Sequence, residues 1–321
     1  MYVHKQRAQT FPRMDELMPF DLVYAASRFM PTFVLHTSEM YFPCDMESYL
    51  EACDLVDGES KAAVMAGPLT NHSLEEGVDG RHLNAPDRRY NLAIRGGGDN
   101  PIIKGCRTED LDMDVPILVY GSRVRSSGHV LVHFVPFYAY NGPTAVLGGT
   151  LWMGEHEADI EHVTAELLPG DDDSYELLGC YLSRHGAEMY YRADVLEGDE
   201  GRQDHKRVYV ARGSHAHYPT AGAHARMYRC AYDVTDDGVS WRPRRVTPVY
   251  PTGSPHYDAS TMGFMRVRGY MGGGYGRGGV SNLCLKAWYT HGLESGVDSE
   301  YLTDDRLVGA GRRVRENAHR K

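Results

Sequence analysis

The stretch Gly154–Thr164, with the sequence GEHEADIEHVT, gathers the side chains of the chain that are best suited to hold a metal ion. A β-strand that begins near Asp159 would place the carboxylates of Asp159 and Glu161 on one face, because side chains alternate along a strand. Like charges this close repel each other unless a cation neutralises them or one carboxyl is protonated. His156 lies three residues before Asp159 and could fold its imidazole over the same spot. The spacing therefore predicts a divalent-cation site made of His156, Asp159 and Glu161.

The ligand types indicate which ion such a site would take. Carboxylate oxygens suit hard cations such as Ca²⁺, Mg²⁺ and Mn²⁺, and a single imidazole among oxygens favours Mg²⁺ or Mn²⁺ somewhat. Zn²⁺ is less favoured. The alternative is that the acidic side chains of this stretch are solvated and that His156 or His162 is an ordinary hydrogen-bonded histidine.

A second group of side chains could supply acid–base chemistry or contacts to a ligand. His185 lies in a tight Arg-His-Gly turn, whereas His215 and His217 follow the expected strand KRVYVA. Imidazole titrates near neutral pH, so His185 or His215 could act as a general acid or base beside the cation. Arg184 and Arg212 could clamp an anionic group, unless they pair with the acidic loops. We therefore predict His185 and His215 as catalytic residues, and Arg184, Arg212 and His217 as ligand-binding residues.

These residues belong to a part of the chain whose pattern is typical of β-strands. From about residue 117 onward, short runs alternate in hydrophobicity or are rich in β-branched and aromatic residues, with Gly, Pro and Asp turns between them. The pattern predicts an all-β protein: a two-sheet antiparallel β-sandwich with short helices and long decorated loops. Loops at strand ends gather at one rim of a sandwich, so histidines and carboxylates of separate hairpins can meet there.

The chain is expected to form one domain with an extension at each end. We predict an N-terminal extension over residues 1–30, a single β-sandwich domain over residues 31–300, and a basic C-terminal tail over residues 301–321. Near the start of the domain, Pro43 indicates a turn. A short helix should follow from Asp45 to Cys53, with Asp45 as its N-cap.

Composition narrows the class of partner and the expected location. The 34 Lys and Arg residues against 44 Asp and Glu residues give a net charge of −10, which argues against a general nucleic-acid or anionic-membrane binder. The six cysteines show no C-x-x-C spacing and are expected to be buried thiols. Neither a signal peptide nor a transmembrane segment is visible. A cytoplasmic or virion-associated location without disulfides is the resulting expectation.

Four motifs, in order, resemble the vacuolar protein sorting-associated protein 62 family of plants, fungi and bacteria. They are LHTSEMYFPCDMESYL, GEHEADIEHVT, YLSRHGAEMYYRADVLE and VYVARGSHAHYPTAG, and the resemblance runs from about residue 35 to about residue 290. This family is poorly characterised, so the resemblance implies a group of relatives more than it implies a function.

The central motif is also similar to that of the necrosis- and ethylene-inducing-peptide-like cytolysins. The similarity places His156, Asp159 and Glu161 on positions that, in that family, help hold a divalent cation at the rim of a β-sandwich. There the cation supports binding to sphingolipid head groups. This chain departs from the motif by one residue added ahead of Asp159 and by Ile160 in place of a tryptophan. It also lacks the upstream aspartate that serves as a further ligand. The resemblance implies a cation site.

Three functions remain open at this stage. The first is a binding module without enzymatic activity, whose cation-bearing rim recognises a glycan, a lipid head group or a protein partner; abundant tyrosines, which stack well on sugars, support it. The second is a metal-dependent hydrolase or lyase that uses the cation and the rim histidines. It lacks a G-x-S-x-G, H-E-x-x-H or P-loop motif. The third is a structural or virion assembly protein that has kept the fold and lost the chemistry.

Overall fold

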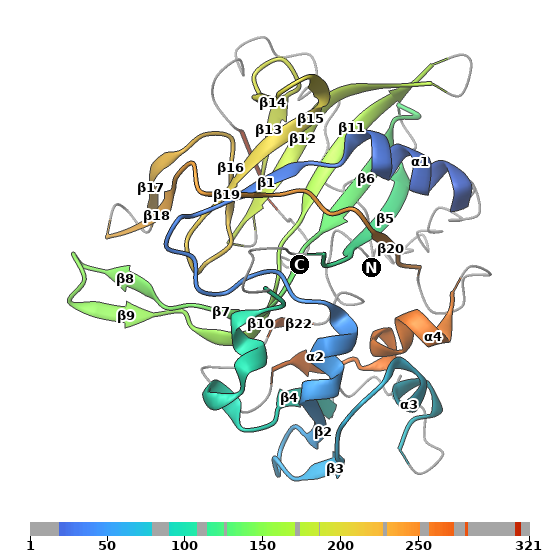
Figure 1. The fold of residues 1–321 in the computed structure, drawn as a ribbon, viewed down its shortest axis with the longest axis vertical. Helices are drawn as coiled ribbons and strands as arrows, with labels where there is room; N and C mark the ends of the chain where they lie inside the picture. Colours follow the sequence, from blue (N-terminus) through green and yellow to red (C-terminus); the bar gives the residue numbers. More distant parts are fainter. Residues whose placement is uncertain are drawn as a thin grey trace, which may run out of the picture.

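The protein is a strand-rich molecule, as the alternating sequence pattern predicts (Figure 1). The computed structural model describes residues 19–78, 90–107, 114–124, 127–170, 174–185, 187–226, 230–250, 257–272, 280–281 and 312–315. The all-β sandwich expected from the sequence is confirmed. Most of the expected basic tail and residues 1–18 of the expected N-terminal extension lie outside the described residues.

The larger sheet of the sandwich has seven strands in the order β20-β5-β6-β11-β12-β13-β23. Neighbouring strands are antiparallel except for β20 and β5, which are parallel. Strand β23 comes from the expected tail and pairs with β13. The strands are β20 (Val246–Pro248), β5 (Ile117–Arg123), β6 (Val130–Val135), β11 (Val163–Pro169), β12 (Tyr175–Arg184), β13 (Ala187–Arg192) and β23 (Arg312–Arg315).

The second sheet of the sandwich is smaller and is built around a parallel pair, β1 and β15. Helix α1 (Pro19–Phe29) packs beside the two sheets, because its residues Leu22, Ala25, Ala26 and Phe29 recur at helical spacing and are all buried. The strands of this sheet are β14 (Gly198–Asp199), β15 (Arg202–Val210), β1 (Thr32–Leu35), β19 (Val239–Trp241) and β16 (His217–Tyr218), which pairs with β15.

Strand β6 shows how one sheet serves two cores. All six of its residues are buried. Val130, Val132 and Phe134 pack in the core between the two sandwich sheets, whereas Leu131 and Val135 belong to a separate core on the opposite face. Alternation along the strand therefore produces a nearly continuous apolar sequence, as expected for a sheet covered on both faces.

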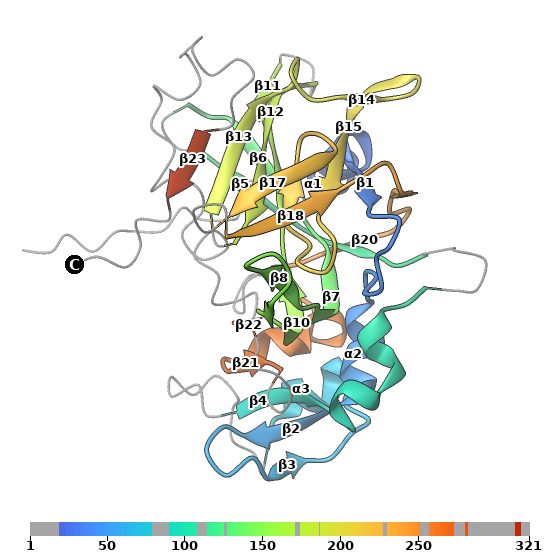
Figure 2. The same ribbon diagram turned by 90° about the vertical axis from the view of Figure 1, so that its left-hand side faces the viewer.

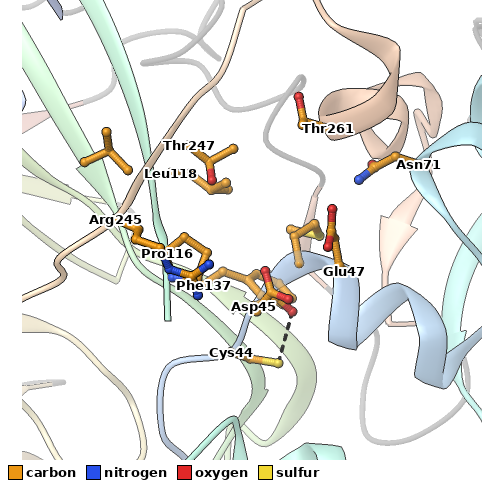
Figure 3. A pocket seen from close by; sticks show the side chains of 12 residues that line it. Cys44, Asp45, Glu47, Asn71, Pro116, Leu118, Phe137, Arg245, Thr247 and Thr261 are labelled. Atoms are coloured by element: carbon orange, nitrogen blue, oxygen red, sulfur yellow. Dashed lines mark hydrogen bonds between the residues drawn. The ribbon is translucent and has the colours of Figure 1, made fainter. Parts of the chain in front are cut away.

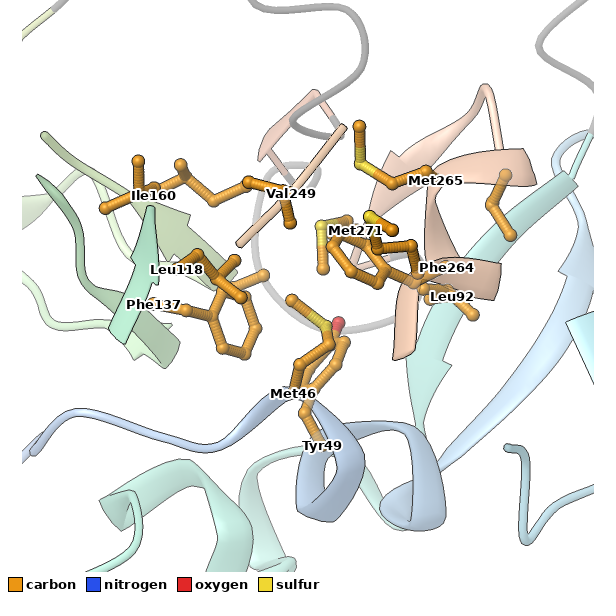
Figure 4. Close-up of a cluster of buried hydrophobic side chains, with 14 of the residues drawn as sticks. Met46, Tyr49, Leu92, Leu118, Phe137, Ile160, Val249, Phe264, Met265 and Met271 are labelled. Atoms are coloured by element: carbon orange, nitrogen blue, oxygen red, sulfur yellow. The ribbon is translucent and has the colours of Figure 1, made fainter. Parts of the chain in front are cut away.

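The second core joins the sandwich to a small sheet and several short helices at the other end of the molecule (Figure 2). Helix α2 (Met46–Ala52) begins as predicted, because the Asp45 carboxylate accepts a hydrogen bond from the Ser48 backbone N–H. Figure 4 shows Met46 and Tyr49 of this helix between Phe137 on one side and Phe264 on the other. The remaining elements here are β2 (Cys53–Asp57), β3 (Ala63–Met65), α3 (Asn71–Glu76), β4 (Tyr90–Ile94), the 3-10 turns Gly97–Asp99, Pro101–Lys104 and Gly263–Arg266, α4 (Ala259–Met262), β21 (Tyr270–Met271) and β22 (Val280–Ser281).

Two hairpins extend from the side of the sandwich where the predicted site residues lie (Figure 1). Strand β8 pairs with β9, and β17 pairs with β18; a single pairing, Ala231 with Val146, joins the two hairpins. Next to them, β7 and β10 form a separate antiparallel pair. Among the described residues, no helix has the length and apolar character needed to cross a membrane. These strands are β7 (Phe137–Asn141), β8 (Thr144–Val146), β9 (Leu151–Met153), β10 (His156–Ile160), β17 (Gly222–Arg226) and β18 (Ala231–Thr235).

Candidate functional site

One tight turn, residues 211–216, gathers the predicted site residues from several strands. It joins β15 to β16, and its ends are held together by the hydrogen bond from Ala211 N–H to the Ala216 carbonyl, at 2.9 Å. Gly213 and His215 have φ values of 71° and 53°, a region that glycine adopts freely and histidine rarely. A histidine in this conformation must be held there by its surroundings.

His215 is held by stacking and by two hydrogen bonds. Its side chain is fully buried, and its ring lies 3.7 Å from the ring of Tyr138 at an angle of 2°. Nδ1 is 3.0 Å from Asp159 Oδ2, and Nε2 is 3.1 Å from the Tyr41 carbonyl oxygen. A carbonyl oxygen only accepts hydrogen bonds, so Nε2 donates to Tyr41, while Nδ1 is the atom that is bonded to Asp159. The Asp159 carboxyl thus has a histidine from a separate segment of the chain as its partner.

The other two predicted metal ligands have separate protein partners. A Glu161 carboxylate oxygen accepts a hydrogen bond from the Ser183 hydroxyl, and His156 Nδ1 lies 2.7 Å from the Ala158 carbonyl oxygen. Strand β10 begins at His156 and not near Asp159, so His156 belongs to the strand and is not in a turn that folds back. Within the part of the chain that the structure describes, no three His, Cys, Asp or Glu side chains are grouped so as to hold a metal ion.

His217 lies in the interior, on the other side of the turn. Its Nδ1 donates to the His162 carbonyl oxygen at 3.1 Å, and its buried Nε2 has no hydrogen-bond partner among the residues that the structure describes. Burial lowers the pKa of His217 to about 3, so this imidazole is neutral at physiological pH. With 1% of its surface exposed, it is not positioned to touch a ligand in solvent.

His162 itself is bonded to a buried glutamate. The His162 Nε2 atom lies 2.5 Å from Glu188 Oε1, and both side chains are buried. Burial raises the pKa of Glu188 to about 8. The two groups therefore hold a proton between them near neutral pH, well inside the protein.

His185, the other predicted catalytic residue, is paired with a buried aspartate near the surface. Its Nε2 lies 2.5 Å from Asp233 Oδ2, and its side chain is 30% exposed, whereas that of Asp233 is 1% exposed. Asp233 also accepts hydrogen bonds from the Tyr218 hydroxyl at 2.7 Å, the Ser214 hydroxyl at 2.9 Å and Arg226 Nη1 at 3.0 Å. Burial alone would raise the pKa of Asp233, but these donors, His185 foremost, lower it to about 2.

The two predicted arginines have different surroundings. The Arg184 guanidinium lies over the ring of Tyr218, 5.1 Å from its centroid, which is a cation–π contact. Arg212 is exposed and lines an open pocket next to Gly213. Arg184 does not line this pocket.

This pocket has a volume of about 410 Å³ and opens where β1, β7 and β15 end. Trp152 and Tyr232 are among its walls and are 58% and 47% exposed. Sequence reasoning missed both residues, although the run LWM in β9 carried a signal. The run has three large apolar residues in a row, which is not the alternation of a half-buried strand, and the structure exposes all three. The pocket is lined by His36, Ser38, Glu39, Met40, Tyr41, Gly142, Pro143, Thr144, Ala145, Trp152, Arg212, Gly213, Tyr232 and Val234.

Glu39 connects the pocket to the buried histidine. One of its carboxylate oxygens accepts from Gly213 N–H at 2.8 Å, and the other accepts from Met40 N–H and Tyr41 N–H at 2.8 and 2.9 Å. Because the Tyr41 carbonyl is bonded to His215, the loop that carries Glu39 is fixed from both sides. The hydrogen bonds to Gly213 and His215 thus fix the position of the Glu39 loop, which forms one wall of the pocket.

The fold and the site together define a β-sandwich with an open pocket at the ends of its strands, and comparisons with known proteins find two similar proteins of yeast. No protein-family model matches the chain. The chain is 28% identical over 134 residues to vacuolar protein sorting-associated protein 62 of Saccharomyces cerevisiae, covering 37% of this chain and 27% of that protein. It is 22% identical over 254 residues to the vacuolar protein sorting-associated protein TDA6 of the same yeast, covering 66% and 50%. The resemblance predicted from the four motifs is confirmed, and the chain spans about half the length of TDA6.

Solved structures with a similar arrangement come from the cytolysin group. One, described as a toxin fold for microbial attack and plant defense, is 11% identical and has a TM-score of 0.41, covering 88% of this chain and 97% of that chain. NLPPya in complex with mannosamine is 10% identical and has a TM-score of 0.39, covering 86% and 91%. The central motif predicts a similarity to this group, and the comparison of structures finds it as well. The TM-scores are too low to transfer any property of those proteins to this chain.

Proposed function

We propose that the protein is a β-sandwich binding module that recognises a glycan in the pocket between the Glu39–Tyr41 loop and the β8–β9 hairpin. The observation that carries this proposal is the pair of exposed aromatic side chains, Trp152 and Tyr232, on the walls of a pocket with polar groups. Sugar rings present apolar C–H faces that pack on aromatic rings, while their hydroxyls need hydrogen-bond partners at the edges. A volume of about 410 Å³ is in the range of small-ligand pockets.

The polar groups of the pocket suit hydroxyl recognition. The exposed Arg212 guanidinium presents several N–H donors in a fixed plane. The His36 imidazole lies 3.5 Å from Asp236 at the opening. Glu39 is only 6% exposed and is held by three backbone N–H groups, so its position does not depend on a ligand. A pocket prepared in this way loses little conformational entropy on binding.

The proposed glycan binding does not use the divalent cation that the sequence predicts. The residues do not fit an ion as the structure arranges them, since Asp159 is bonded to His215, Glu161 to Ser183 and His156 to a backbone carbonyl. The cation therefore stays a prediction. Glycan titrations with and without excess EDTA test it: unchanged affinity means that binding needs no cation that EDTA removes, and a loss of affinity favours the cation.

The glycan proposal is tested by calorimetric titration of the full chain with glucosamine and mannosamine, followed by a glycan array. Trp152→Ala should weaken binding at least about 10-fold, because it removes a stacking surface without touching the core. Tyr270→Ala is the matched control, since Tyr270 is 43% exposed and does not line the pocket. Retention of full affinity in Trp152→Ala, or no binding to any glycan on the array, would falsify the proposal.

A second candidate function, acid–base catalysis, is favoured by one observation. His185 is partly exposed and its Nε2 is held by the buried carboxylate of Asp233 at 2.5 Å. A carboxylate in this position orients an imidazole and stabilises its protonated form, as catalytic histidines require. His215 does not share this property, because both of its ring nitrogens are bonded inside the protein.

A further inference from the structure

Two thiols from distant parts of the chain lie in contact beside helix α2. Cys44 Sγ and Cys106 Sγ are 3.4 Å apart, although 62 positions separate the residues in the sequence. Cys44 Sγ lies 3.4 Å from the Asp45 carbonyl oxygen, and Cys106 Sγ accepts from Asp45 N–H at 3.4 Å. The two sulfur atoms are thus aligned by the same backbone residue.

The backbone around both cysteines is fixed, which keeps the sulfur atoms adjacent. Cys106 N–H donates to the Pro43 carbonyl at 3.0 Å, and Phe42 N–H donates to the Lys104 carbonyl at 3.0 Å. Cys44 N–H is bonded to the Phe137 carbonyl of β7 at 2.7 Å. A disulfide requires a sulfur–sulfur distance of about 2.05 Å, so the two atoms need to approach by roughly 1.3 Å.

The two thiols are chemically unequal, as a nucleophile and a resolving thiol must be. The hydrogen bond from Cys44, together with the Asp45 N–H, lowers the pKa of Cys106 to about 7 despite partial burial. Burial raises the pKa of Cys44 well above its ordinary value. Cys106 therefore carries thiolate near neutral pH, and Cys44 is the thiol that donates to it.

Cys106, the thiolate of the pair, is only partly buried, whereas Cys44 is buried and lines a neighbouring pocket. This pocket has a volume of about 230 Å³, and Figure 3 shows the Cys44 sulfur beside Asp45, with Glu47 and Arg245 also on the walls. Cys53 and Cys180 differ, since both are buried and burial raises their pKa. Cys230 is exposed. Of the cysteines that the structure describes, only Cys44 and Cys106 have an interaction between their sulfur atoms.

The geometry points to Cys44 and Cys106 as an oxidation site, at which hydrogen peroxide produces a reversible disulfide. The Cys106 thiolate attacks one peroxide oxygen, becomes a sulfenic acid and releases hydroxide. The hydroxide takes the proton of the Cys44 thiol and becomes water. The Cys44 thiolate then attacks the Cys106 sulfur, and the displaced hydroxide leaves as water after taking up a proton from solvent. In total, two thiols lose two electrons and two protons, and one peroxide becomes two waters.

The experiment exposes the folded full chain to a small excess of hydrogen peroxide, blocks the remaining thiols with N-ethylmaleimide and maps the peptides. We expect a peptide pair linked through Cys44 and Cys106, lighter than its separate parts by about 2 Da and separated again by dithiothreitol. The disulfide closes a long loop, so the melting temperature should rise by roughly 5 °C.

Variants identify the order of the two steps. In Cys44→Ser, oxidation should stop at a sulfenic acid on Cys106 that dimedone labels, whereas Cys106→Ser should leave Cys44 unoxidised. Cys230→Ser is the control and should form the disulfide as the wild type does. Should peroxide modify Cys230 while both Cys44 and Cys106 remain open to alkylation after unfolding, the inference is overturned. Mapping of the wild type alone decides this, even if a variant does not fold.

Discussion

The two histidine–aspartate pairs beside the 211–216 turn are built in opposite ways. In the first pair the histidine is the interior partner: the side chains of His215 and Asp159 are 0% and 8% exposed. In the second pair the aspartate is the interior partner, and the side chains of His185 and Asp233 are 30% and 1% exposed. The residue types and the distances are similar, yet only the second pair presents its imidazole toward solvent.

This difference assigns the two pairs different roles. His215 bonds on both sides of its ring and stacks on Tyr138, so it cross-links β10, the turn and the Tyr41 loop. Asp233 collects donors from three directions and holds His185 by a single nitrogen. A histidine beside a carboxylate is therefore structural when both nitrogens are used, and open to chemistry when one is free for solvent.

The largest effect expected from this comparison follows removal of the interior histidine. His215→Ala should lower the free energy of unfolding by about 3 kcal/mol, because it removes the hydrogen bond from the ring to the buried Asp159 and opens a cavity beside Tyr138. Urea denaturation monitored by tryptophan fluorescence measures the loss. The control is His156→Ala, in which one bond of a partly exposed side chain to a backbone carbonyl is removed. An equal loss in both variants would contradict the cross-linking role.

A smaller effect is expected at the interior aspartate. Asp233→Asn should lower the free energy of unfolding by about 2 kcal/mol. It removes the charge to which His185, Tyr218 and Arg226 donate hydrogen bonds. The pKa of Asp233 is lowered to about 2 in the folded state. Its stabilisation is therefore complete above its ordinary value of 3.8 and is lost as the pH falls toward 2.

The pH dependence provides the check. The difference in unfolding free energy between wild type and Asp233→Asn, measured with urea, should be constant from pH 7 to pH 5 and should shrink between pH 4 and pH 2, around the lowered pKa of Asp233. A difference that stays the same down to pH 2 would mean that the Asp233 charge does not support the fold.

Local sequence patterns were sufficient to predict the sandwich and helix α2. Alternating or β-branched runs after residue 117 become β5, β6, β7, β11, β12, β13, β15 and β18, and Asp45 caps the helix as its position before Met46 predicts. The small sheet at the other end was not predicted. Its strand β4 pairs with β2 on one side and, on the other, with β21, which lies far along the chain. Pairing across such a distance leaves no periodic signal.

In the candidate site, too, local patterns were predictable and contacts between distant segments were not. Histidines and carboxylates of separate hairpins were predicted to meet at one rim, and the structure places His215 of the 211–216 turn beside Asp159. The side chain that is hydrogen-bonded to the Asp159 carboxylate is a histidine 56 positions away, and the spacing within the motif cannot reveal it. Glu39, Trp152 and Tyr232 were missed, because a pocket wall is defined by exposure and by contacts between separate segments.

The smallest effect on stability is expected at the exposed histidine, where it separates the two proposed functions. His185→Gln should change the free energy of unfolding by less than about 1 kcal/mol, because His185 is partly exposed and Asp233 keeps three other donors. Turnover of p-nitrophenyl esters, phosphoesters and glycosides is measured alongside glycan affinity. A binding module keeps its affinity in this variant and shows no turnover in the wild type. Wild-type turnover that is abolished in His185→Gln but kept in His72→Gln, a change at a histidine that is 77% exposed, would instead establish catalysis at the second pair.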